Sequence, residues 1–63
     1  MTLTQYELLI IKRLASGLSA SELAKEMSLP PETLGARITT ARNRVGAKNT
    51  THLCVMAAKE GLV

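Results

Sequence analysis

Apolar residues recur along this chain at the spacing of amphipathic helices, and residues that begin and end helices separate the apolar stretches. The first stretch covers about residues 4–15, where Thr4 is a candidate N-cap and Gly17 a stop signal. Ser19, followed three residues later by a glutamate, forms a capping box that predicts a short helix over about residues 20–27. We therefore expect two helices in the N-terminal half of the chain.

The C-terminal half carries signals for two further helices. Pro31 suits the first turn of a helix, because its missing amide hydrogen would be unpaired there, and Gly46 can adopt the left-handed conformation that closes one. A third helix is therefore predicted over residues 31–45. Asn49 is a good N-cap for a fourth helix over about residues 50–60. Since no strand-like alternation competes with this pattern, we expect an all-α fold.

The second and third predicted helices are separated by a short turn, which is the arrangement of a helix-turn-helix. The third helix carries two neighbouring stripes. Its apolar stripe, which suits a core, contains Leu34, Ile38, Ala41 and Val45. Its polar stripe contains Thr33, Arg37, Thr40 and Arg44. We expect the polar stripe, with both guanidiniums turned outward, to meet a partner; the alternative is a structural helix with a solvated polar face.

The net charge of +3 is concentrated in one segment, residues 31–48, and the charges of the rest of the chain cancel. The charged side chains of this segment are Arg37, Arg42, Arg44 and Lys48, against Glu32. Such a concentration is typical of a phosphate-binding element, although a solvated helix face shows the same pattern. Tyr6 is the only aromatic residue, so stacking platforms for single strands are not expected and a nucleic-acid partner would be double-stranded.

Length and composition allow one small domain over residues 1–63. Cys54 and His52 are the only residues of their types, so we expect no disulfide and no metal site, with the thiol packed and the imidazole above the first turn of the fourth helix. Without a glycine-rich phosphate loop or convergent acid and base residues, neither an enzyme nor a cofactor is expected. The absence of a signal peptide or a stretch of transmembrane length predicts a cytoplasmic protein without membrane contact.

Short motifs of the chain, taken together with their spacing, carry a resemblance. They are Leu3-Thr4, Ala15-x-Gly17-Leu18-Ser19, Glu22-Leu23-Ala24, Thr33-Leu34, Gly46, Asn49, Ala57 and Gly61-Leu62. Spanning essentially the whole chain without a gap, the pattern resembles the LuxR-type helix-turn-helix domain, also called FixJ- or GerE-type. The resemblance implies a four-helix regulator of transcription, whose third helix enters the major groove and whose fourth helix commonly pairs with its twofold mate.

From this resemblance we expect double-stranded DNA as the partner, bound by a homodimer, with another regulator or RNA polymerase as a further partner. The residues expected at the DNA are Thr33, Gly35, Ala36, Arg37, Thr40, Arg44 and Lys48. Those expected nearest the twofold contact are Val55, Met56 and Lys59. Arg44 replaces a lysine of the family pattern, which keeps the positive charge for a phosphate or a guanine.

The chain departs from the family pattern at positions that bear on function. Gly35 stands where the family has a lysine, which removes one expected DNA contact and costs about 1 kcal/mol of helix propensity. Pro30 replaces the usual serine cap of the third helix. Tyr6 and Leu9 replace an arginine and a glutamate on the first helix, and with Leu8 they either form an interface patch or wrap into the core. The alternative function is therefore a protein-interaction module that uses the same scaffold to pair with another regulator.

Overall fold

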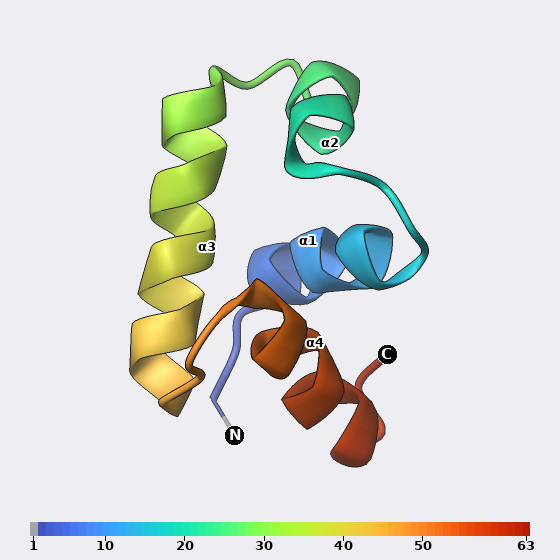
Figure 1. The fold of residues 1–63 in the computed structure, drawn as a ribbon, viewed down its shortest axis with the longest axis vertical. Helices are drawn as coiled ribbons and strands as arrows, with labels where there is room; N and C mark the ends of the chain where they lie inside the picture. Colours follow the sequence, from blue (N-terminus) through green and yellow to red (C-terminus); the bar gives the residue numbers. More distant parts are fainter. Residues whose placement is uncertain (1) are drawn as a thin grey trace.

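The computed structural model describes residues 2–63, which form four helices joined by short turns (Figure 1). The helices are α1 (Gln5–Ala15), α2 (Ala20–Glu26), α3 (Pro31–Val45) and α4 (Thr50–Lys59). The predicted all-α fold is confirmed. The second and fourth helices each end one residue before the predicted boundary, because Met27 and Glu60 take the C-cap positions.

Side chains at the helix starts accept backbone amides that a helix leaves unpaired. Thr4 and Ser19 each form a capping box, in which the hydroxyl accepts a first-turn amide and a glutamate accepts the amide of the cap residue. At the start of α4, Asn49 Oδ1 accepts the His52 amide at 2.8 Å. Pro30 provides no side-chain bond at the start of α3, as the loss of the serine hydroxyl predicts. Local sequence signals thus determine where three of the helices begin.

Two residues with left-handed backbone conformations shape the turns on either side of α3. Ser28 has a φ of 56°, a conformation that costs a residue with a Cβ roughly 1–2 kcal/mol. The Leu29 amide donates to the Ala24 carbonyl at 2.9 Å and closes the end of α2. Gly46 ends α3 with a φ of 75°, which glycine adopts without a steric penalty. The turns leave α2 beside the first half of α3 and α4 beside its second half (Figure 1).

Two apolar clusters hold the helices together, and α1 contributes to both. The first cluster joins α1, α2 and α3 and contains Ile10, Leu23, Ala24, Leu34 and Ile38. The second joins α1, α3, the following loop and α4 and contains Ile11, Ala41, Ala47, Leu53 and Ala57. Both α1 and α3 contact each of the other helices, so these two helices connect the whole fold. The apolar stripe of α3 packs as predicted, and this packing fixes the rotation of α3 about its own axis.

Gly35 lies in the interior of α3, where glycine weakens a helix by its backbone entropy. A Cβ at this position would meet nothing within 4 Å. Gly35→Ala is therefore expected to raise the free energy of unfolding by about 0.5–1 kcal/mol. Gly46→Ala is the matched control, because its φ of 75° should make the same change destabilising. Urea unfolding measures both variants, and a destabilised Gly35→Ala would contradict a regular helix at this position.

Candidate nucleic-acid interface

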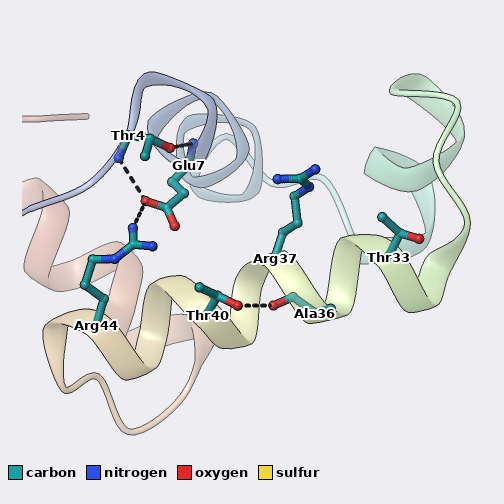
Figure 2. Close-up of a pocket in the computed structure, with 7 residues that line it drawn as sticks. All are labelled: Thr4, Glu7, Thr33, Ala36, Arg37, Thr40 and Arg44. Atoms are coloured by element: carbon teal, nitrogen blue, oxygen red, sulfur yellow. Dashed lines mark hydrogen bonds and ion pairs between the residues drawn. The ribbon is translucent and has the colours of Figure 1, made fainter.

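The core covers one side of α3 and leaves the rest of the helix surface exposed. Because successive residues of a helix are rotated by about 100°, most of the exposed residues fall into two regions. One is a flank that faces α1, and it carries the predicted polar stripe (Figure 2). The other, which we call the outer face, lies opposite the core and contains Glu32, Ala36, Thr39 and Asn43, all exposed.

The flank of α3 and the start of α1 line a shallow groove of about 380 Å³ (Figure 2). The residues around it are Thr4, Glu7, Thr33, Ala36, Arg37, Thr40 and Arg44. Five of the predicted DNA-contacting residues thus lie around one groove, whereas Gly35 and Lys48 do not line it. In Figure 2 the side chains of Arg37 and Arg44 both extend from α3 toward α1.

Arg44 is engaged by an acid of the domain itself. Its guanidinium forms an ion pair and a hydrogen bond with Glu7 of α1. The same carboxylate oxygen accepts the Thr4 amide at 2.8 Å, so the N-terminal cap of α1 also holds the acid in place. The Glu7 side chain is only 9% exposed and that of Arg44 is 37% exposed. Arg44, which the sequence pattern turned outward toward a partner, thus also has a counter-charge inside the domain, the buried carboxylate of Glu7.

The pKa of Glu7 indicates whether the carboxyl of this pair is ionised. Burial acts to raise the pKa of the carboxyl. The hydrogen bonds from Thr4 and the guanidinium of Arg44 outweigh burial, and the pKa lies below its ordinary value. Glu7 is therefore ionised at neutral pH, and the pair is an electrostatic link between α1 and α3.

Arg37 lies above the ring of Tyr6, with its guanidinium carbon 4.7 Å from the ring centroid. The ring has no net charge, so this contact orients the guanidinium without neutralising it. Tyr6 is 36% exposed and Leu9 is 43% exposed, so neither wraps into the core. Tyr6 is nevertheless partnered, because it supports a cation of α3.

The two threonines of the polar stripe differ in their surroundings. Thr33 is half-buried in the first turn of α3. Thr40 is exposed, and its hydroxyl donates to the Ala36 carbonyl at 2.9 Å (Figure 2). Because that bond uses the hydroxyl hydrogen, the Thr40 oxygen remains an acceptor for a partner. Gly35 and Ala36 are exposed and present little side-chain bulk, so another molecule can approach this turn of the backbone closely.

The loop between α3 and α4 places Lys48 by a chain of hydrogen bonds. A guanidinium nitrogen of Arg42 donates to the Lys48 carbonyl at 2.8 Å. The Lys48 amide donates to His52 Nδ1 at 3.0 Å. His52 thus sits at the first turn of α4 as predicted and orders the loop. The side chain of Lys48 is left exposed beside the end of α3.

The predicted twofold contact lies on α4. Val55 is 44% exposed and Lys59 is exposed, whereas Met56 is half-buried against the second apolar cluster. Cys54 also packs against that cluster, and burial raises the pKa of its thiol. Of the three predicted contact residues, Val55 is the one that presents a large apolar side chain to solvent.

Two further features bear on function. Among residues 2–63, no group of three or more histidine, cysteine, aspartate or glutamate side chains is placed to hold a metal ion. None of the described helices has the length and apolar character needed to cross a membrane.

The sequence pattern did not identify the partners of the arginines. Glu7 falls among the apolar positions of α1, and an acid on a core-facing stripe is a signal for a buried cation nearby. Tyr6 stood out as a departure from the family pattern, but nothing local indicated that it would support Arg37. Both partners lie on α1, far from α3 in the chain.

The chain matches known proteins over nearly its whole length. The family described as bacterial regulatory proteins, luxR family, matches residues 1–57. The transcriptional regulatory protein YdfI of Bacillus subtilis (strain 168) is 28% identical over 61 residues, which cover 97% of this chain and 29% of that protein. The chain thus spans less than a third of the length of this curated relative. No solved structure matches the chain. The four helices and the extent of the family match together establish that this chain belongs to the luxR family of bacterial regulatory proteins.

Proposed function

We propose that the chain binds double-stranded DNA and regulates transcription, with α3 in the major groove. Besides family membership, the position of α3 supports this proposal. The core locks one side of α3, and the opposite side is exposed along three turns, from Glu32 to Asn43. A helix held in this way fits the width of the major groove, about 12 Å.

Two cations are available for the phosphates. Arg37 is exposed and oriented by Tyr6, and Lys48 lies exposed beyond the end of α3. Arg44 is assigned a positioning role instead, because Glu7 already pairs with its guanidinium. Thr33 and Thr40 lie on the same flank as Arg37 and offer hydroxyl groups to the backbone of the duplex.

We further propose that two copies bind a near-palindromic site, with α4 at the twofold contact. The exposed Val55 supports this assignment, with Met56 and Lys59 beside it. A small domain also buries little apolar area alone, so pairing would add stability. We also propose a cytoplasmic location, where a regulator of transcription would meet DNA, and RNA polymerase or another regulator as a further partner.

Arg37→Ala is expected to weaken binding to duplex DNA by about tenfold at low salt, because one phosphate contact is lost. The salt slope, which is the steepness with which the logarithm of the binding constant falls with the logarithm of the salt concentration, should decrease by about one per subunit. Arg44→Ala should leave the salt slope unchanged, since its charge is paired with Glu7. Fluorescence anisotropy of a labelled duplex over a range of salt concentrations measures both effects.

Lys12→Ala is the matched control, because it removes the same charge from an exposed position on α1. Its salt slope should equal that of the parent chain. If Arg37→Ala and Arg44→Ala both bind as the parent does, the flank of α3 does not contact DNA. If the parent chain binds no duplex even at low salt, the proposed function fails.

A second candidate is a protein-interaction module that pairs with another regulator through α1. The exposure of Leu9, at 43%, is the observation that favours it. Tyr6 argues for the first candidate, because its ring supports a cation that is available to a phosphate. The anisotropy experiment separates the two, since the second candidate predicts weak duplex binding that is insensitive to Arg37→Ala.

A further inference from the structure

Each arginine of α3 is held on a flank of the helix by a contact within the domain. Arg37 lies over the Tyr6 ring, with 4.7 Å between guanidinium carbon and centroid. Arg44 pairs with Glu7. Arg42 donates to the Lys48 carbonyl at 2.8 Å. These contacts direct all three guanidiniums away from the outer face of α3.

The outer face therefore lacks lysine and arginine, the residue types that most often recognise guanine. Lysine and arginine bind guanine by donating to its O6 and N7 atoms, and neither residue type occurs among the outer-face residues. The single charged residue of this face is Glu32, which can only accept hydrogen bonds when ionised. A guanine opposite Ala36 and Thr39 would thus find the Thr39 hydroxyl as a single donor and no bidentate lysine or arginine partner on the outer face.

The same face has groups that suit thymine. The side chains of Ala36 and Thr39 are exposed and end in methyl groups, which make apolar contacts with the thymine 5-methyl group. Gly35, next to Ala36, adds no side chain that would hold the helix away from the bases. Asn43, further along the face, has the amide that pairs with adenine N6 and N7.

We infer that this chain reads A·T pairs at the centre of each half-site, with Ala36 and Thr39 against thymine 5-methyl groups and no arginine contact to guanine. The inference rests on the proposed function and names the DNA sequence class that α3 selects. Arg37 then contacts the phosphates at the edge of the groove, beside the bases that the outer face reads.

Selection of the 63-residue chain on a pool of random duplexes identifies bound sites, in which we expect A·T pairs at the centre of each half-site. In a selected duplex, replacing one such thymine by deoxyuridine removes only the 5-methyl group. The affinity should fall about fourfold per methyl contact. Thr39→Ser removes the methyl group from the protein side and keeps the hydroxyl. In this variant the deoxyuridine effect should disappear at the thymine that Thr39 contacts and persist elsewhere.

Thr51→Ser on α4 is the matched control, because Thr51 is also an exposed helical threonine, and it should keep the full deoxyuridine effect. Guanines at the centre of the selected half-sites would overturn the inference. Equal affinity for thymine and deoxyuridine sites would also overturn it. In both cases salt-dependent binding to duplexes would leave the proposed function standing. Failure to bind any duplex at low salt would overturn both proposals.

Discussion

Replacing Leu34 by alanine is expected to lower the free energy of unfolding by about 2–5 kcal/mol. Leu34 is 1% exposed and belongs to the cluster that joins α1, α2 and α3. The substitution removes apolar contacts and leaves a cavity that this small core can fill only in part. A domain of this size has a total stability of about 3–9 kcal/mol, so the variant should be close to unfolding at room temperature. Urea or thermal unfolding followed by circular dichroism measures the loss.

Leu9→Ala is the matched control for this prediction. It deletes the same atoms from a leucine of α1, but Leu9 is 43% exposed. We therefore expect the free energy of unfolding to change by no more than about 0.5 kcal/mol. Each kcal/mol lost from the free energy of unfolding should lower the melting temperature by roughly 4–8 °C in a domain of this length. Similar losses for Leu9→Ala and Leu34→Ala would contradict the assignment of Leu34, and hence the inner side of α3, to the core.

Replacing Glu7 by alanine is expected to lower the free energy of unfolding by about 2–3 kcal/mol. The carboxylate has two functions, since it accepts the Thr4 amide at the start of α1 and pairs with Arg44 of α3. The exposure of Arg44, at 37%, keeps the expected loss below that of a fully buried pair. Urea unfolding of the two single variants and of the double variant with Arg44→Ala separates the pair from the cap. Strictly additive losses would show that the ion pair contributes nothing.

The same carboxylate predicts a dependence of stability on pH. The pKa of Glu7 in the folded chain lies below its ordinary value, because the hydrogen bonds from Thr4 and the charge of Arg44 outweigh burial. Its contribution to stability is therefore complete above the unfolded value of about 4.3 and is lost as the pH falls through the folded value. Glu7→Gln keeps an oxygen for the Thr4 amide but has no ionisation, so its stability should fall less on acidification.

These variants also test how the candidate interface is built. Leu34 sets the rotation of α3, and the Glu7–Arg44 pair fixes one flank of α3 against α1. The outer face lies opposite the packed side, so the packing of that side decides that these residues are exposed. A change that loosens either contact is expected to weaken duplex binding without touching DNA itself.

Local signals in the sequence were sufficient to predict where the helices begin and end. Thr4, Ser19 and Asn49 lie at helix starts, and Gly46 ends α3, because caps and left-handed glycines act over three or four neighbouring residues. The apolar stripe of α3 also predicted its buried side correctly, since helical spacing places Leu34, Ile38 and Ala41 together.

The candidate interface was only partly predictable. Spacing placed Thr33, Arg37, Thr40 and Arg44 on one stripe, and the structure brings all four to one groove. Spacing turned both guanidiniums outward, and it did not reveal that Arg44 pairs with Glu7 inside the domain. A helical pattern gives the rotation of each side chain about its own helix, but it carries no information about which other element covers each flank.

The amino-acid sequence by itself determined the four helices, the buried side of α3, the concentration of positive charge in residues 31–48 and the family. Only the tertiary structure decided what each arginine does. Glu7 and Arg44 are separated by 37 positions, and α1 brings them together because it contacts every other helix. Helical spacing sets which residues share the outer face, and the packing of the opposite side decides that this face is exposed, because burial depends on which other helices cover α3.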